Sequence, residues 1–288
     1  MKDRLVYLLV RGLVGLFGLL PVGGARRVGE FGGRIWHLVG GERKRMVRRH
    51  MRRVLGADAD LERAVREVFT SYGRYWAETF WVRPRRIPEI DRGLTVDGLE
   101  NLAAAGRAGT GAVIALPHLG NWEAGALSGF RAGIQIVAVA ERLGNPLITA
   151  WFTTLREAFG IKVILNVKGV MRQVEEAVRA GGAVCLLADR DLKGRGVKTE
   201  FFGEVTTLPA GPVALASRTG APLLPAVVFF TPTGHHVVFG PPMALPTGPD
   251  RLERGTRMVT AQLESDIRRA PEQWHLLQPN WPSDRVEE

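Results

Sequence analysis

The sequence places a histidine and a carboxylate, His118 and Glu123, five residues apart just after an apolar run. The segment 115–123 has the pattern of a strand end, a turn and then a helix for which Asn121 is a suitable N-cap. On one continuous helix the two side chains would diverge by about 140°, but a turn through Gly120 can bring them together. A carboxylate bonded to one imidazole nitrogen stabilises the cation that forms when the other nitrogen takes a proton. We therefore predict that His118 is a general base oriented by Glu123, a purely structural histidine being the alternative.

Other kinds of catalytic site find less support in the sequence. No Gly-x-Ser-x-Gly segment supplies a nucleophile for a serine hydrolase, and no His-Glu-x-x-His pattern supplies zinc ligands. His235 and His236 are adjacent at the start of an apolar run, so in a strand their side chains should diverge. Cys185 is the only cysteine, and its apolar neighbours predict a buried, unreactive thiol. We expect no metal and no cofactor.

Elements of two kinds must position these residues. Residues 2–82 carry apolar side chains at helical spacing, interrupted by turns near 21–24 and 56–60. From residue 93 onward, short apolar runs alternate with amphipathic stretches, which is typical of a sheet with helices on its faces. We predict strands at 94–96, 112–116, 134–139, 162–164, 183–187, 223–230 and 236–239, and helices near 98–106, 121–131, 145–159, 169–180, 209–219 and 250–269.

The fold class that follows is α/β, with a mixed, mostly parallel central sheet, helices on its faces and a helical N-terminal extension. A chain of 288 residues is long enough to bury a core without disulfides. We expect a single domain over residues 1–288, with a membrane-facing helical part (1–85) and a catalytic α/β part (93–282). Open α/β sheets bind ligands at the carboxyl ends of their strands, where His118 is expected.

The charge balance favours an anionic partner. The net charge is +10 and the sequence pI is about 10.5, so nucleic acid, anionic lipid and phosphorylated small molecules are the candidates. Zinc-finger spacing and an aromatic RNA-binding signature are missing, and we therefore do not expect nucleic acid.

The N-terminal segment predicts contact with a membrane surface. Residues 5–20 are mostly apolar but too short for a span of about 20 residues, and Arg11 would be costly in hydrocarbon. No clear signal-peptide cleavage site follows. Together with the basic run 43–49, the segment predicts a helix that lies in the membrane interface. A core helix followed by a solvated basic helix is the alternative.

The His-x4-Glu pattern at a strand end resembles the His-x4-Asp/Glu motif of the glycerolipid and lipid A acyltransferases, within the lysophospholipid acyltransferase superfamily. Further segments follow in the order of that family, at 139–142 (VAER), 155–160 (LREAFG), 187–191 (LADRD), 200–203 (EFFG), 208–216 (LPAGPVALA) and 270–275 (APEQWH). The resemblance spans about residues 1–282 and is specific because the order is kept. Segments 188–191 and 274–281 are most similar to the actinobacterial phosphatidylinositol mannoside acyltransferases.

This resemblance implies an enzyme that transfers an acyl chain from a thioester of coenzyme A, or of acyl carrier protein, to a hydroxyl. His118 would take the hydroxyl proton during attack on the thioester, with no covalent acyl-enzyme. Arg156 and nearby backbone amides would stabilise the oxyanion. Surface ion pairs for Arg142 and Arg156, and a local salt bridge around Asp189, are the alternatives. The implied substrate-binding residues are Glu141, Arg142, Arg156, Asp189, Arg190 and Glu200.

The acceptor implied by the resemblance is a sugar hydroxyl of a phosphatidylinositol mannoside, with acyl-CoA as the donor. Carboxylates such as Asp189 accept hydrogen bonds from sugar hydroxyls, and an arginine suits an inositol phosphate. A lipid A precursor and a lysophospholipid stay open as acceptors, and a non-catalytic protein that binds anionic lipid is the alternative of another class. We expect a monomer, peripheral on the cytoplasmic face of the plasma membrane.

Overall fold

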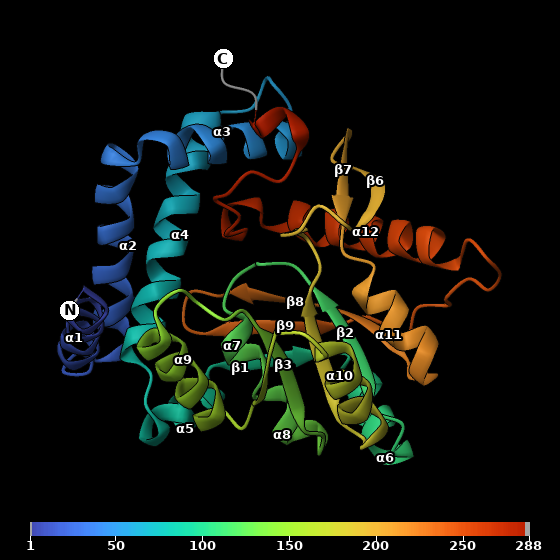
Figure 1. Ribbon diagram of the computed structural model, residues 1–288. Helices are drawn as coiled ribbons and strands as arrows, with labels where there is room; N and C mark the ends of the chain where they lie inside the picture. Colours follow the sequence, from blue (N-terminus) through green and yellow to red (C-terminus); the bar gives the residue numbers. More distant parts are fainter. Residues whose placement is uncertain (1, 286–288) are drawn as a thin grey trace.

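The computed structural model describes residues 2–285, and its centre is a seven-stranded sheet (Figure 1). The strand order is β1-β9-β8-β2-β5-β3-β4, and each neighbouring pair is parallel except the antiparallel pair β8–β9. All of β2 is buried, as expected for a central strand covered on both faces. The strands span Leu94–Asp97 (β1), Ala112–Leu116 (β2), Ile136–Ala140 (β3), Lys162–Leu165 (β4), Ala183–Leu187 (β5), Leu223–Phe230 (β8) and His235–Phe239 (β9).

Helices cover the two faces of this sheet and form two separate cores. Because side chains alternate along a strand, Val113 and Ala115 of β2 enter one core, while Ile114 and Leu116 enter the other. The first core also takes residues of α10 (Val170–Arg179), α11 (Gly211–Thr219) and α12 (Arg251–Arg269). The second takes residues of α6 (Leu99–Ala108), α7 (Trp122–Gly125) and α9 (Pro146–Ala158), with α8 (Ser128–Ala132) next to them.

The N-terminal part is helical, as predicted, and its second and fourth helices pack closely. A Cβ on Gly33 would lie 2.1 Å from the carbonyl oxygen of Phe69, and one on Gly29 would lie 2.5 Å from that of Gly73. These glycines therefore let the two helix backbones touch, side by side in Figure 1. The elements are α1 (Lys2–Phe17), α2 (Val22–Val39), α3 (Gly41–Leu55) and α4 (Leu61–Trp81), followed by the short η1 (Pro84–Arg86) and α5 (Ile87–Arg92). Among residues 2–285, no helix has the length and apolar character needed to span a membrane.

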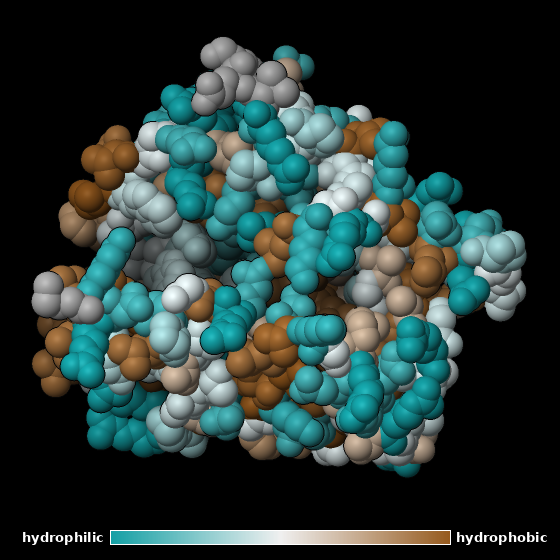
Figure 2. Space-filling view, viewed as in Figure 1, coloured by the Kyte–Doolittle hydropathy of each residue, from teal (hydrophilic) through white to brown (hydrophobic). Residues whose placement is uncertain are grey.

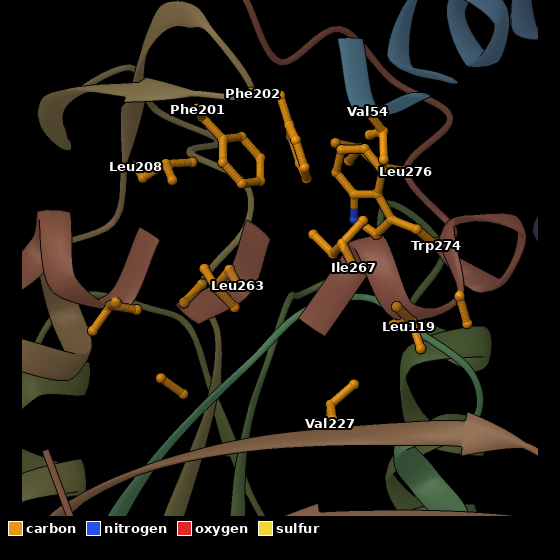
Figure 3. Close-up of a cluster of buried hydrophobic side chains, with 14 of the residues drawn as sticks. Val54, Leu119, Phe201, Phe202, Leu208, Val227, Leu263, Ile267, Trp274 and Leu276 are labelled. Carbon is orange, nitrogen blue, oxygen red and sulfur yellow. The ribbon is translucent and has the colours of Figure 1, made fainter. Parts of the chain in front are cut away.

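A two-stranded hairpin, β6 (Val197–Phe201) and β7 (Glu204–Leu208), packs against the last segment of the chain. Figure 3 shows Phe201 and Phe202 facing Trp274, with Leu119 of the His118 loop nearby. The rings of Phe201 and Phe202 lie 6.0 and 5.7 Å from that of Trp274. This apolar cluster holds the segment that contains η2 (Pro271–Gln273) and η3 (Pro282–Arg285) against the site.

The predicted fold class is confirmed, including the mostly parallel sheet and the helices before it. The stretch predicted as one helix at 121–131 is broken into α7 and α8, and the strand predicted from residue 134 begins at Ile136. The hairpin β6–β7 has no counterpart among the predicted strands, because its short, polar-rich sequence lacks an apolar run. That the chain is one domain stays a prediction.

Candidate active site

His118 lies in a tight loop between β2 and α7. The side chain of Asn121 caps α7 by accepting a hydrogen bond from the amide of Ala124 at 3.3 Å. Gly120 has a φ of +61°, and a Cβ there would lie 2.1 Å from the carbonyl oxygen of Val228. Only glycine fits this turn without displacing a neighbouring strand. The local sequence thus produces the strand-to-helix turn that we predicted.

The partner of His118 is Asp189, two residues beyond the end of β5. Nδ1 of His118 lies 2.7 Å from Oδ1 of Asp189, and the His118 amide donates to Oδ2 at 3.0 Å. Asp189 is fully buried. Burial alone would raise the pKa of the Asp189 carboxyl. The neighbouring His118 and the hydrogen bonds that Asp189 accepts outweigh burial, so that the pKa of Asp189 is lowered. Asp189 is therefore an anion placed to fix the imidazole with its Nδ1 proton toward the carboxylate and Nε2 toward the outside.

The prediction that Glu123 directly orients His118 is wrong. Glu123 instead accepts three hydrogen bonds from Arg156 of α9, with Nε at 3.0 and 3.1 Å and Nη2 at 2.7 Å. The reason is the strand order. Leu116 of β2 is paired with Leu187 of β5, so the residues two positions further along each strand, His118 and Asp189, meet at the same edge of the sheet. The sequence does not reveal that β5 is the neighbour of β2.

The segment around Trp274 clamps this pair from the other side. The indole Nε1 of Trp274 donates to Oδ2 of Asp189 at 2.8 Å, and the amide of His275 donates to the His118 carbonyl at 2.7 Å. Asn280 donates through Nδ2 to the Asp189 carbonyl at 3.0 Å. Trp274 entered the sequence analysis only as part of a family resemblance, and no local pattern connects it with a residue 85 positions earlier.

A buried ionic cluster joins the helical N-terminal part to the His118 loop. Its centre is Glu78 of α4, which pairs with Arg26 of α2 at 2.7 Å and with His235 of β9 at 2.7 Å. Glu78 also accepts a hydrogen bond from Asn121 Nδ2 at 2.7 Å. Burial would raise the pKa of Glu78, but His235 and the two arginines Arg74 and Arg26 together hold it below the usual range. Glu78 therefore stays ionised within the cluster and anchors Asn121, the N-cap residue of α7.

An apolar pocket opens beside Glu123 and Arg156. The pocket runs between the sheet and the helices α7 and α9, over residues of β2, β3, β5, β8 and β9. Most of the lining is apolar, with Ile114, Ile136, Ala138, Ala226 and Phe239 among its residues, and Cys185 also lines the pocket. Burial raises the pKa of the Cys185 thiol to about 12, so the thiol stays protonated and unreactive. The lining therefore suits an apolar ligand with a polar group near Glu123 and Arg156.

The other predicted substrate-binding residues lie in different settings. Glu141 and Arg142 are exposed just after β3. Arg190 is half-buried, and burial lowers the pKa of its guanidinium, although Glu141 acts in the opposite direction. Glu200 is exposed on the hairpin strand β6, which is not part of the sheet that carries His118 and Asp189 at its strand ends. Among residues 2–285, no group of three or more His, Cys, Asp or Glu side chains is arranged to hold a metal ion.

Comparison with known proteins assigns the family. Residues 2–283 match the family described as bacterial lipid A biosynthesis acyltransferase. A "Phosphatidylinositol mannoside acyltransferase" of Mycobacterium tuberculosis (strain CDC 1551 / Oshkosh) is 34% identical over 275 residues, covering 93% of this chain and 86% of that protein. A protein of the same name from Mycolicibacterium smegmatis is 35% identical over 259 residues, covering 84% of this chain and 81% of its own. The chain therefore belongs to the bacterial lipid A biosynthesis acyltransferase family and is an acyltransferase.

Proposed function

We propose that this acyltransferase moves a long-chain acyl group from acyl-CoA to a sugar hydroxyl of a phosphatidylinositol mannoside. The observation that carries the chemistry is the His118–Asp189 pair, with 2.7 Å between Nδ1 and Oδ1. The acceptor is carried over from the names of the mycobacterial relatives.

The reaction follows from the orientation of the imidazole. Nε2 of His118 takes the proton of the sugar hydroxyl while the hydroxyl oxygen attacks the thioester carbonyl carbon. Asp189 stabilises the imidazolium that forms. When the tetrahedral intermediate collapses, the carbon–sulfur bond breaks and the imidazolium returns the proton to the leaving thiolate. The products are the sugar ester and free coenzyme A, and the enzyme is unchanged.

The pocket provides the place for the donor chain. Its apolar lining suits a hydrocarbon, and its polar lining residues Glu123 and Arg156 lie on the helices that follow β2 and β3. Glu123 then acts as a positioning residue, since its three hydrogen bonds hold the Arg156 guanidinium against the pocket. There the cation favours the negative charge that develops on the thioester oxygen.

Membrane contact is proposed to occur through α1 and α2. Leu8 and Leu9 of α1 are each 63% exposed, and Phe31 of α2 is 62% exposed, so both helices present unpartnered apolar faces. Several arginines lie close together near the end of α1. The pKa of the partly buried Arg83 is lowered by burial and, in addition, by the positive charges of Arg85, Arg86 and Arg11. Leucines beside arginines suit a bilayer with anionic headgroups. Because acyl-CoA is a cytoplasmic metabolite, we propose the cytoplasmic face.

The basic run 43–49 contributes less to this surface than its sequence indicates. Lys44 and Arg48 both pair with Glu62, at 2.7 and 3.0 Å. Arg43 donates to the Leu277 carbonyl, and Arg49 donates to the Ser283 carbonyl. The helix α3 that carries them crosses the top of the molecule, away from α1 (Figure 1). Lys44 and Arg48 therefore link α3 to α4, while Arg43 and Arg49 link it to the last segment.

The acceptor is tested by competition. Purified protein receives palmitoyl-CoA and vesicles that contain a phosphatidylinositol mannoside, a lysophospholipid or a lipid A precursor, and product formation is followed by mass spectrometry. We expect the mannoside to give the highest kcat/KM. Faster acylation of either other lipid would refute the proposed acceptor. If none of the three lipids led to release of coenzyme A, transfer to a lipid would be refuted.

A further inference from the structure

A row of aromatic side chains leads away from His118 along the molecule. The ring of Trp122 lies 5.4 Å from that of His118, and Tyr75 of α4 stacks on Trp122 at 4.6 Å. Trp76 follows at 5.6 Å from Tyr75. The reacting histidine thus stands at one end of a continuous aromatic contact path.

The other end of this path reaches α1. Phe80 lies 5.5 Å from Trp76, and it contacts Trp151 of α9 at 6.0 Å and Phe17 of α1 at 6.0 Å. The helices α1 and α9 also touch, since Asn145 Nδ2 donates to the Asp3 carbonyl at 3.0 Å. The path therefore ends beneath the helix whose outer face exposes leucines.

Most of these rings are partly exposed to solvent, whereas core residues are buried. We define the aromatic strip as Tyr72, Trp76, Phe80, Trp122, Trp151 and Phe152, each of which is partly exposed. Tyr72, Trp76 and Phe80 are spaced by four residues, so they share one face of α4. Figure 2 shows the molecule hollowed over the middle of α4, between α2 and the sheet.

The aromatic strip is separate from the pocket that suits the donor chain. The pocket is enclosed by the sheet and the helices α7 and α9, and Trp122 is the member of the strip that also lines it. The reaction brings together two lipids, so it needs a second apolar surface that starts at His118 and opens toward the membrane. The aromatic strip has both properties.

We propose that the aromatic strip holds the fatty chains of the membrane-borne acceptor while its sugar hydroxyl reaches His118. The inference rests on the proposed transfer to a glycolipid. Continuity supplies the argument: ring contacts run from His118 to Phe17 of α1, with the buried Tyr75 joining Trp122 to Trp76. The partly exposed strip lies along this path, so a lipid that enters from the bilayer at α1 would meet aromatic rings on the way to the catalytic histidine. Flat rings with polar edges also suit the boundary between hydrocarbon and water.

The test compares a lipid acceptor with its water-soluble headgroup. Phosphatidylinositol mannoside in vesicles is one acceptor, and the same molecule after alkaline removal of both fatty chains is the other. The variants are Trp76→Gln and Trp151→Gln, which place a polar group in the strip. Phe130→Ala is the matched control, because Phe130 is an exposed aromatic residue on α8 outside the strip. The readout is kcat/KM for the lipid divided by kcat/KM for the headgroup.

We expect this ratio to fall about tenfold for each glutamine variant, the size that follows from lost apolar contact over one large ring. Phe130→Ala should leave the ratio as in the unmodified protein, and Trp76→Phe, which keeps an apolar ring, should retain most of it. Equal losses with both acceptors would overturn the inference and show that Trp76 serves only folding. Undiminished kcat/KM with both acceptors in the glutamine variants would overturn it as well. If the unmodified protein acylated neither acceptor, the proposed function itself would fail.

Discussion

Replacing Asp189 by asparagine separates the two interpretations of this residue, orientation of His118 or binding of the acceptor. The carboxylate accepts from His118 Nδ1 through Oδ1, and from the His118 amide and Trp274 Nε1 through Oδ2. An asparagine offers one acceptor and one donor group in their place. It must therefore present its NH2 either to the imidazole or to the other two donors.

If the asparagine NH2 faces the His118 amide and Trp274 Nε1, these two buried N–H groups have no acceptor, at a cost of about 1–3 kcal/mol each. The orientation in which the asparagine NH2 faces the imidazole is therefore favoured. It forces His118 to carry its proton on Nε2, so that Nδ1 can accept from the amide. In this tautomer Nε2 cannot act as a base. We expect kcat to fall about 10³–10⁴-fold, as when the aspartate of a serine protease triad is replaced by asparagine, while the fold is kept.

The assay follows free coenzyme A with a thiol reagent, once with the lipid acceptor and once with water as the only acceptor. Because Asp189 acts on His118, both rates should fall by the same factor. Asp97→Asn is the matched control: Asp97 is an exposed carboxylate that bonds Nε2 of His236 through Oδ2 at 2.8 Å, and an asparagine oxygen can accept that bond. A normal rate of hydrolysis together with lost transfer in Asp189→Asn would refute our reasoning and make Asp189 an acceptor-binding residue.

Four further changes have defined outcomes. Glu123→Gln leaves Arg156 without its charge partner, which for a buried pair costs about 3–5 kcal/mol; Tm should fall clearly, and Arg156→Met in the same chain should restore part of it. Ala138→Phe fills the pocket, so palmitoyl-CoA should lose at least about tenfold in kcat/KM against octanoyl-CoA; equal losses for both chains would remove the pocket from donor binding. Leu9→Asp with Phe31→Asp should abolish sedimentation with anionic vesicles, and undiminished binding would move the membrane surface elsewhere. Burial lowers the pKa of the His275 imidazole to about 3. As the pH falls below about 6.5, His275 is therefore protonated in the unfolded chain but not in the folded protein, and the free energy of unfolding falls by at most about 1.4 kcal/mol per pH unit. His275→Gln should make Tm depend less on pH between 6.5 and 5, and an equally steep dependence would contradict the lowered pKa.

The fold could be predicted largely because the signals are local. Apolar runs such as 112–116 and 183–187 identify buried strands, and the turn through Gly120 follows from a strand end, a glycine and an N-cap residue in succession. The position of His118 after a strand end was predicted in the same way. These features depend on neighbours in the sequence, which a single chain displays directly.

The rest of the site depends on strand order and distant contacts. Glu123 is near His118 in sequence, yet Asp189 reaches the imidazole because β5 lies beside β2. Trp274 reaches the same carboxylate through the packing of the last segment on the hairpin β6–β7. Carboxylates follow several strands of this chain, and the sequence alone does not say which strands are adjacent. Which carboxylate becomes the partner of His118 depends on which strand lies beside β2.

The most direct test of the central claim, that His118 is the base for direct transfer, is the rate of His118→Ala. The measurement uses palmitoyl-CoA and the lipid acceptor, with circular dichroism to confirm folding and intact-protein mass spectrometry to look for acylated protein. Our account predicts a loss of about 10²–10⁴-fold and no palmitoylated protein at any time in the unmodified enzyme. Near-normal turnover by folded His118→Ala, or an acyl-enzyme that forms and decays at the rate of turnover, would contradict it.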